Sequence, residues 1–383
     1  MRAASTRAEL APRGPSGDTA QVTGHQTLLT IDLDALAANY ATFVREAAGA
    51  EVAPAVKANG YGLGAVEVSR RLMAEGARSF FVARLEEAEV LRAALGPEPT
   101  LYVLDGATPG SGARLEAAGL TPVLNSTAQV EDWAARARGG PPLPAALHVD
   151  TGMNRLGLNL DEAEALAAAA DRLQGLRLGL VMSHLACADD PPHPLNVRQR
   201  DAFRHVRRLF PDARASFANS AGVFLGEDYL FDQVRPGISL YGGGPRGRPD
   251  PRIRPVATFE VPILQVRTAL PGETVGYGAT HTVERPTRIG IIAAGYADGV
   301  LRSGSNQAFA AFEGRRCPVL GRVSMDLLAI DMGDAAAAPG DLIQLLGPDV
   351  PLDEAAARAG TIPYELLTRL GPRAQRRYLG AAG

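Results

Sequence analysis

The sequence predicts an α/β protein in which an N-terminal (β/α)8 TIM barrel precedes a C-terminal mainly-β domain. Three observations support this. Eight short β-rich runs occur between residues 33 and 245, and segments rich in Ala, Leu, Glu and Arg separate most of them. Beyond about residue 256 the runs are strand-like throughout, divided by Gly, Pro and Asp turns. The length of 383 residues also exceeds that of a typical single domain.

The eight runs of the predicted barrel read, in order, VAPAVKA, SFFVAR, TLYVLDG, TPVLNS, AALHVDTG, LGLVMSHLA, ASFANSAG and DQVRPGISLYG. Segments such as LEEAEVLRAAL and DEAEALAAAADRLQG lie between them and consist of good helix formers. Short strands that alternate with helices are typical of a parallel sheet, and eight such units close into a barrel.

The second domain is predicted from VATFEVPILQVRTAL, TRIGIIAAGYADGV, AFAAFEGRRCPVLGRVSMDLLAIDM and GDLIQLLG. We therefore assign residues 27–255 to the barrel and residues 256–383 to the β-rich domain. Residues 27–32 (TLLTID) form an early strand that is a candidate to pair with the second domain. Residues 1–26 are rich in Ala, Gly, Ser, Thr and Pro and have no apolar run, so we expect a disordered extension there.

Composition excludes several classes of function. The formal net charge of −3 gives no electrostatic basis for binding nucleic acid or an anionic membrane. The arginine-rich stretch RHVRRLF at 204–210 is interpreted as a solvated helix face. No apolar run is long enough to span a membrane. The two cysteines, Cys187 and Cys317, form neither a disulfide framework nor a metal-binding pattern, which favours a reducing, cytoplasmic location and no metal.

The stretch AVKANGYGLG contains Lys57, the only lysine in a chain whose other strongly basic residues are all arginines. A lysine amine can form a Schiff base with an aldehyde and can lose its proton near neutral pH, whereas an arginine guanidinium does neither. Lys57 is therefore a candidate for covalent catalysis. On this fact alone, chance survival of one lysine under GC-rich codon usage is an equally good explanation.

Several polar residues fall at or after the carboxyl ends of the predicted strands, where TIM barrels place their active sites. They are Lys57, His148, Arg155, His184, Asn219, Ser220 and Arg235. Taken singly, His184 is also typical of a hydrogen-bonded rim histidine, and Arg235 of a structural ion pair. Because all seven share one rim, the sequence predicts a converging site there.

The loops after the seventh and eighth strands are where barrels often bind phosphate. Here Ser220 offers a hydroxyl, and Gly237 and Ile238 offer backbone N–H groups that a ligand can approach closely. Tyr61, four residues after Lys57, adds a phenolic donor. An aldehyde-reactive lysine beside a phosphate site points to pyridoxal 5′-phosphate.

From about residue 27 to its end, the sequence resembles the alanine racemase family of fold-type III pyridoxal-phosphate enzymes. The motifs that carry the resemblance are, in the family's order, AVKANGYGLG, VDTGMNRLG, SHLACAD, ANSAG, VRPGISLYG, VGYGATHTV, GYADGVLR, GRVSMD and IPYELL. Each is weak alone, and together they are highly specific. The implied reaction converts L-alanine to D-alanine, a precursor of peptidoglycan. Whether the role is biosynthetic or catabolic stays open.

The resemblance implies that Lys57 binds the cofactor covalently and is one of two acid–base residues. Tyr277, in VGYGAT, matches the second base, which in this family comes from the other subunit of a homodimer. Arg235 matches the arginine that faces the pyridine nitrogen, and His184 matches its hydrogen-bond partner. Arg155 matches the arginine that contacts the cofactor's phenolic oxygen and the substrate.

The other implied roles concern the cofactor's phosphate and the amino-acid substrate. The residues matching the phosphate-binding set are Tyr61, Ser220, Gly237, Ile238 and Tyr364. Met325 matches the contact to the substrate carboxylate, also from the partner subunit, and Tyr296 lines the path by which substrate reaches the site.

Three other functions remain open from the sequence. A racemase of broader or different amino-acid specificity is the strongest, because the sequence does not fix the size of the substrate pocket. A fold-type III decarboxylase typically places an acidic residue at the pyridine nitrogen, where this chain has Arg235. A cofactor-carrying barrel without catalysis usually lacks the second domain.

The sequence departs from the family's pattern at two positions. His148 stands where the family often has a lysine that is commonly carbamylated, so we expect no carbamate in this chain. Ser324 stands where the family often has a cysteine.

Overall fold

The computed structural model describes residues 26–380, so all but the last residue of the expected extension at 1–26 lies outside the described residues. Eight parallel strands form the N-terminal sheet, in the order β2-β9-β8-β7-β6-β5-β4-β3. Their bounds are β2 (Glu51–Val52), β3 (Ser79–Val82), β4 (Thr100–Val103), β5 (Thr121–Leu124), β6 (Leu143–His148), β7 (Leu176–Met182), β8 (Arg214–Asn219) and β9 (Gln233–Arg235). A parallel bridge between Ala55 and Phe81 joins the first strand to the second and closes the circle. The predicted barrel is therefore confirmed.

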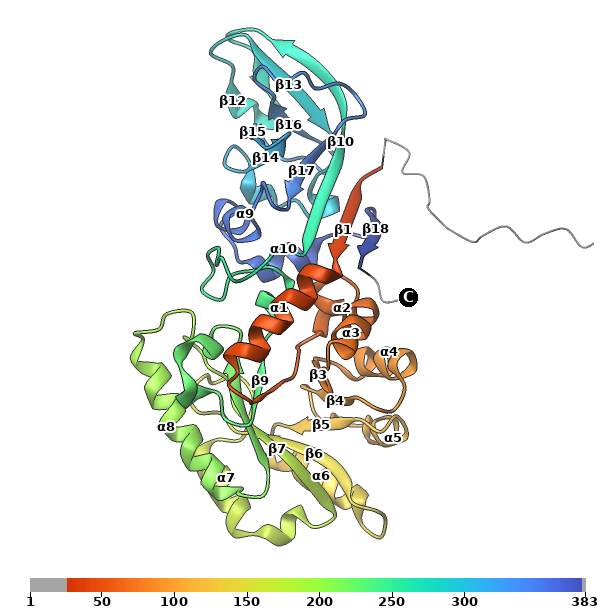
Figure 1. Ribbon diagram of the computed structural model, residues 1–383, viewed down its shortest axis with the longest axis vertical. Coiled ribbons are helices and arrows are strands. Elements are labelled where there is room, and N and C mark those ends of the chain that lie inside the picture. The colour runs from red at the N-terminus through yellow and green to blue at the C-terminus, as the bar shows by residue number, and fades with distance from the viewer. Residues whose placement is uncertain (1–25, 381–383) are drawn as a thin grey trace, which may run out of the picture.

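Helices cover the outside of this sheet (Figure 1). They are α1 (Leu33–Glu46), α2 (Lys57–Tyr61), α3 (Ala65–Ala74), α4 (Leu85–Leu95), α5 (Gly112–Ala117), α6 (Thr127–Ala137), α7 (Leu160–Ala168) and α8 (Pro194–Leu209). Short 3-10 turns follow as η1 (Ala170–Leu173), η2 (Gly222–Leu225), η3 (Glu227–Tyr229) and η4 (Ile238–Tyr241). Side chains that alternate along the strands fill the barrel interior as one buried cluster of Ala53, Phe81, Tyr102, Val123, Ala146, Leu180 and Met182.

The C-terminal domain is built on a second eight-stranded sheet, of order β13-β16-β15-β14-β17-β10-β1-β18. Its strands are β1 (Leu28–Asp32), β10 (Ala257–Ala269), β13 (Thr287–Ile292), β14 (Phe309–Phe312), β15 (Arg315–Leu320), β16 (Leu328–Asp331), β17 (Leu342–Leu346) and β18 (Gln375–Leu379). Because β13 also pairs with β10, the strands between them form a closed arrangement. The first described strand, β1, belongs to this sheet, where it lies between β10, to which it is antiparallel, and β18, to which it is parallel.

Smaller elements complete this domain. A two-stranded ribbon of β11 (Thr274–Val275) and β12 (His281–Thr282) holds the turn η5 (Tyr277–Ala279) between its strands. The turns η6 (Tyr296–Asp298) and η7 (Arg302–Gly304) follow β13, and the helices α9 (Leu352–Arg358) and α10 (Pro363–Arg369) precede β18. In Figure 1, α10 lies at the junction with the barrel, whereas β12 and β13 lie toward the opposite end of the domain.

Two contacts that involve backbone groups hold the two domains against each other. The carboxylate of Asp353 is buried and accepts hydrogen bonds from the N–H of Gly244, at 3.1 and 2.9 Å, in the segment between the domains. Gly62 lies so close to α10 that a Cβ there would be 2.4 Å from the carbonyl oxygen of Leu367. α10 is therefore held directly against the turn that follows Lys57.

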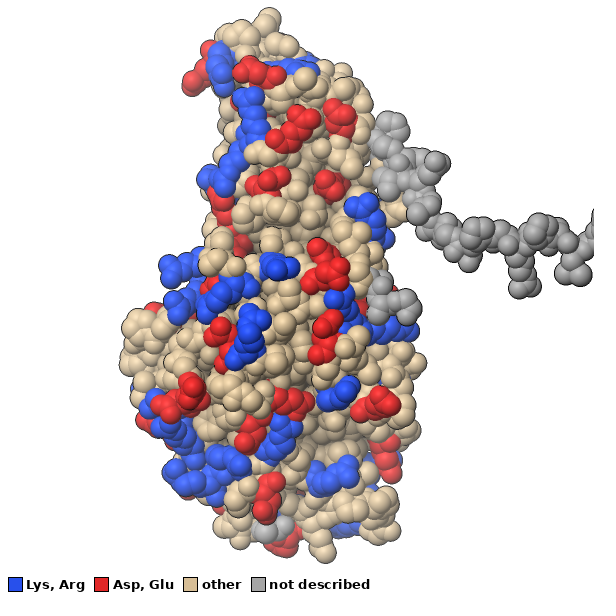
Figure 2. Space-filling model, viewed as in Figure 1, with Lys and Arg blue, Asp and Glu red and all other residues tan. Residues whose placement is uncertain are grey.

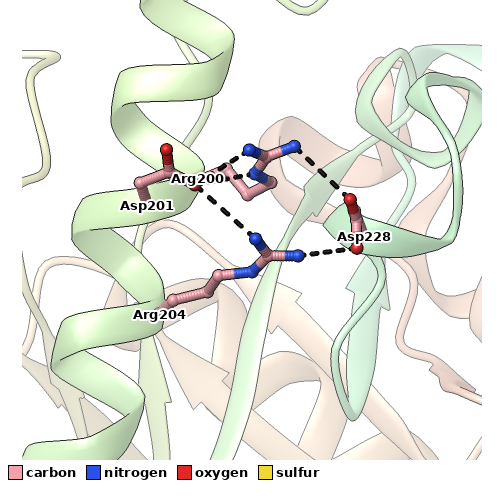
Figure 3. A network of polar contacts seen from close by, with 4 residues as sticks. All are labelled: Arg200, Asp201, Arg204 and Asp228. Carbon is pink, nitrogen blue, oxygen red and sulfur yellow. Dashed lines mark hydrogen bonds and ion pairs between the residues drawn. The ribbon is translucent and has the colours of Figure 1, made fainter.

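Charged side chains of both signs are interspersed over the face shown in Figure 2. On the barrel wall, Arg200 and Arg204 of α8 bridge to Asp228 of η3 and to Asp201 (Figure 3). These four side chains are solvent-accessible, so each pair contributes less than about 1 kcal/mol to folding stability. Between residues 26 and 380, no helix combines the length and apolar character needed to span a bilayer.

Candidate active site at the barrel rim

Most of the residues singled out in the sequence follow the strands of the barrel. Lys57 and Tyr61 begin and end α2, and Arg155 lies in the loop after β6. His184 and Ser220 come just after β7 and β8, and Arg235 ends β9. The others are Gly237 and Ile238 at the start of η4, Tyr364 on α10, Tyr277 in η5, Tyr296 in η6 and Met325 between β15 and β16.

The turn that presents Lys57 is left-handed. Residues 58–61 all have positive φ, from 52° to 61°, and only Gly60 among them is a glycine. Each non-glycine residue in this conformation costs roughly 1–2 kcal/mol, less for Asn. The Asn59 side chain accepts a hydrogen bond from the N–H of Ala65 at 3.0 Å, which ties the turn to α3. Lys57 is thus held on a strained but well-defined backbone.

The environment of Lys57 lowers the pKa of its amine. Burial is the largest cause, and the nearby Arg155 guanidinium adds to it, while Glu87 and Asp105 act in the opposite direction. A lowered pKa increases the fraction of neutral amine, which is the nucleophilic form.

Arg235 is a buried cation held by neutral acceptors. It is 5% exposed. Its Nη1 donates to the Ser216 hydroxyl at 2.6 Å, and its Nη2 donates to the carbonyl oxygens of Ser183 at 2.5 Å and Phe217 at 3.3 Å. Within residues 26–380, no carboxylate lies within ion-pair distance of it. Burial lowers the pKa of Arg235 to about 9, which leaves it cationic at neutral pH.

His184 lies against Arg235, with Nδ1 at 3.3 Å from the Arg235 Nη2. Burial and the Arg235 charge hold the pKa of His184 well below its usual value, so the ring is neutral. Because the guanidinium can only donate, the Nδ1 of His184 accepts, and its proton is on Nε2.

Four residues, Ser220, Gly237, Tyr61 and Tyr364, form a chain of close contacts. The hydroxyl oxygen of Ser220 accepts from the N–H of Gly237 at 2.8 Å, which leaves its own proton free to donate elsewhere. A Cβ on Gly237 would lie 2.2 Å from the phenolic oxygen of Tyr61, so only glycine fits there. The Tyr61 ring is 5.9 Å from that of Tyr364, on α10. The Gly237 N–H, which the sequence suggested as a phosphate donor, already donates to Ser220 in this structure.

His148, at the end of β6, is buried, and its tautomer follows from its neighbour Asn125. The Asn125 Nδ2 donates to two backbone carbonyls, each at 2.8 Å, so its Oδ1 faces His148 as an acceptor. The His148 Nδ1 lies 2.9 Å from that oxygen and must carry the proton. Burial, with the Arg235 charge, lowers the pKa of His148 to about 4, so its Nε2 is a neutral acceptor at neutral pH.

Asn125 and two further residues, Glu87 and Asp150, orient the rim and were not predicted from the sequence. The Asp150 side chain accepts from the N–H groups of Gly152 and Met153, each at 2.7 Å, and so shapes the loop that carries Arg155. The rule that singles out polar residues after barrel strands would have found Asn125 at the end of VLN and Asp150 after LHV. Glu87 occupies the third position of α4, where a capping-box glutamate is expected.

Three of the predicted residues lie apart from the rim, on the surface of the C-terminal domain. Tyr277 is 73% exposed, Met325 52% and Tyr296 46%. Tyr296 is tied to the Met325 segment, because its N–H donates to the carbonyl oxygen of Ser324 at 3.0 Å. Tyr277 lines a shallow depression formed by C-terminal domain residues alone. We call Tyr277, Tyr296 and Met325 the exposed cluster. The single chain does not bring it to Lys57.

The chain matches the family model described as alanine racemase, N-terminal domain, over residues 31–245, and the model described as alanine racemase, C-terminal domain, over residues 256–378. A curated alanine racemase of Methylobacterium sp. (strain 4-46) is 49% identical over 360 residues, which are 93% of this chain and 98% of that protein. A catabolic alanine racemase of Agrobacterium fabrum is 46% identical over 355 residues, 92% of each chain.

Solved structures agree with these relatives. The crystal structure of alanine racemase from Bartonella henselae with covalently bound pyridoxal phosphate superposes with a TM-score of 0.88, at 38% sequence identity, and covers 92% of this chain and 99% of that one. The biosynthetic alanine racemase of Pseudomonas aeruginosa superposes with a TM-score of 0.87 at 37% identity, covering 93% and 99%. This chain belongs to the alanine racemase family.

Proposed function

We propose that this chain is a pyridoxal-phosphate-dependent alanine racemase. The observation that supports the proposal is the barrel rim, which carries the only lysine of the chain, with a lowered amine pKa, together with the hydroxyls of Ser220 and Tyr61 and the buried guanidinium of Arg235. The family membership and the covalently bound pyridoxal phosphate of the Bartonella henselae neighbour support it.

The rim residues fit this cofactor group by group. Lys57 suits the aldehyde. The hydroxyls of Ser220, Tyr61 and Tyr364 and the backbone N–H of Ile238 suit the phosphate, and the N–H of Gly237 would do so if it left its present acceptor, the Ser220 hydroxyl. Arg235 suits the pyridine nitrogen, with His184 as its support, and Arg155 suits the phenolic oxygen. When bound, the cofactor withdraws electrons from the substrate and so acidifies its Cα proton.

The chain's own residues then move the proton. Lys57 holds or releases a proton on one face of the substrate Cα, and Tyr277 of a partner subunit does so on the other face, so that the centre inverts. Both groups exchange protons by general acid–base catalysis. Arg155 and Met325 orient the substrate carboxylate, and Tyr296 borders the path of access.

The role of Arg235 in this proposal is to favour racemisation over transamination or decarboxylation. Because Arg235 is a buried cation with no carboxylate neighbour in the described chain, it would disfavour a proton on a pyridine nitrogen bound next to it. With a weaker pull of electrons into the ring, return of the proton to Cα would be favoured over its delivery to another carbon. An acidic residue at this position would favour decarboxylation or transamination chemistry instead.

The exposed cluster motivates a homodimer with shared active sites. In this arrangement residues 27–255 carry the cofactor and residues 256–383 supply Tyr277 and Met325 to the neighbouring barrel. A large exposed apolar or aromatic group that lies far from any partner in its own chain is typical of an interface. The two free cysteines suit a cytoplasmic enzyme, and a D-alanine supply for peptidoglycan is the proposed role.

A racemisation assay tests the proposal. The purified chain, with and without added pyridoxal 5′-phosphate, is given a panel of L-amino acids, and the D-enantiomer and carbon dioxide are both measured. We expect cofactor-dependent D-alanine formation and no carbon dioxide. Carbon dioxide without D-product would replace the proposal by a decarboxylase, and faster turnover of another amino acid would move the substrate away from alanine.

A further inference from the structure

Glu87 stands out among the residues around Lys57 because its carboxylate bonds only to backbone. Its Oε1 accepts from the N–H of Ala58, the residue after Lys57, at 2.6 Å. Its Oε2 accepts from the N–H groups of Ala83 and Arg84, at 2.8 and 3.2 Å, just past the end of β3. One carboxylate therefore joins the ends of two neighbouring barrel strands at the point where Lys57 leaves the barrel.

The turn held in this way is the strained one. Ala58 has φ 52° and ψ 47°, a conformation that an alanine adopts only when its surroundings impose it. Glu87 satisfies the N–H group of this residue with a charge-assisted hydrogen bond, the strongest kind available to a backbone amide. The hydrogen bond fixes the plane of the Lys57–Ala58 peptide, and a right-handed conformation at Ala58 would redirect the chain that follows, from Asn59 on, relative to that plane.

The carboxylate cannot be replaced by its neutral isostere without loss. Both of its oxygens face N–H donors, so a glutamine there would turn its own NH2 group toward at least one donor and leave that bond unmade. Glu86, the preceding residue in the same helical turn, makes a contrast. Its exposed carboxylate pairs with Arg114 at 3.3 Å and bonds to none of these backbone groups.

We propose that Glu87 is a positioning residue for Lys57, whose carboxylate holds the left-handed turn in the conformation that presents the amine to the cofactor aldehyde. The inference rests on the proposed role of Lys57. The alternative is that Glu87 only caps α4, in which case its loss lowers stability and leaves Lys57 unaffected.

The test uses the full-length chain freed of cofactor, and compares the wild type with Glu87→Gln and with the matched control Glu86→Gln. Added pyridoxal 5′-phosphate is captured covalently, and the rate is followed by absorbance. We expect Glu87→Gln to slow capture by about ten- to a hundredfold, the effect of misplacing a reacting group by about 1 Å. Glu86→Gln should change it by less than about twofold.

Loss of the Glu87 charge and loss of the turn's conformation should change the rate of covalent capture in opposite directions. Removing the Glu87 charge lowers the pKa of Lys57 further, because that charge opposes the effects of burial and Arg155. More neutral amine would speed capture, so slower capture identifies positioning. The amine pKa itself is measured by 13C-methylation of the chain, since Lys57 and the N-terminus are its only primary amines and a Lys57→Arg protein assigns the two signals.

Hydrogen exchange provides a second readout. The peptide that covers residues 55–64 should exchange faster in Glu87→Gln than in either other protein. If Glu87→Gln does not fold, the same measurements are made on Glu87→Gln with Ala58→Gly, because glycine adopts the left-handed conformation without strain. Capture and exchange equal to those of Glu86→Gln would overturn the inference. Absence of covalent capture by the wild type would instead overturn the proposed function.

Discussion

The barrel rim and the exposed cluster differ in how completely one chain builds them. At the rim, Arg235 makes four hydrogen bonds or close polar contacts to its own chain, and Ser220 is likewise bonded and buried. In the exposed cluster, Tyr277 is 73% exposed. It lies on the turn η5, which joins β11 and β12, two strands of only two residues each. The polar groups of the rim are thus held in place by contacts within one chain. The exposed cluster contains Tyr277, the second base of the proposed function, which would act only when the barrel of a partner subunit covers it.

The largest expected effect is at the rim. Lys57→Ala or Lys57→Arg should abolish covalent cofactor binding and lower kcat by at least about a thousandfold, because no other lysine exists in the chain. Absorbance of the bound cofactor and D-alanine formation are measured together. Full turnover with the absorbance of covalently bound cofactor in Lys57→Ala would show that the rim has been assigned wrongly.

The next effect is in the exposed cluster. Tyr277→Phe keeps the ring and removes the proton carrier, so we expect a loss of roughly 10²–10⁴-fold, the usual contribution of a general acid or base. The loss should differ between the two directions, because each base takes the proton from one enantiomer. The check is the solvent isotope effect measured from L-alanine and from D-alanine. Equal, wild-type rates in both directions would leave Lys57 as the only base.

The rim should also respond to pH through His148. Its pKa is about 4 in the folded chain, against 6.5 for an ordinary histidine, so the unfolded chain binds this proton first as pH falls. The contribution of the neutral His148 ring to the free energy of unfolding is fully present above about pH 6.5. It is lost as the pH falls toward 4, by roughly 3 kcal/mol in all. Urea denaturation of the wild type and of His148→Asn at pH 7, 5.5 and 4.5 measures it, and parallel stability curves would contradict the lowered pKa.

The smallest expected effect is that of His148→Ala on function. This ring lies within reach of the Arg155 charge and offers a neutral acceptor rather than a negative charge, so its loss should weaken cofactor affinity or rate by about 1–2 kcal/mol, roughly 5- to 30-fold. Activity should not depend on added bicarbonate. Complete inactivity of His148→Ala with the cofactor still bound, or a bicarbonate requirement in the wild type, would show that a charged group is needed there.

The same contrast explains what the sequence could predict. The barrel and its rim residues were accessible, because strands that alternate with helices bring their carboxyl ends to one face. Asn125 ends its strand and Glu87 is the third residue of its helix, so general rules single out both positions. Those rules do not reveal their partners, which are a histidine ring and backbone N–H groups near Lys57. The left-handed conformation of Ala58 has no signal in its own residue type, although the following Asn-Gly pair indicates a turn. The partner of Tyr277 follows from the family resemblance and from no physical pattern in the chain.

The most direct test of the split site mixes two inactive proteins. Lys57→Ala protomers lack the rim base and Tyr277→Phe protomers lack the second base, so a heterodimer has one site with both bases intact. After verified subunit exchange, we expect activity to return, up to about a quarter of the wild-type value if protomers pair at random and each site acts alone. No recovery in a mixture shown to contain heterodimers would contradict the account and place both bases within one chain.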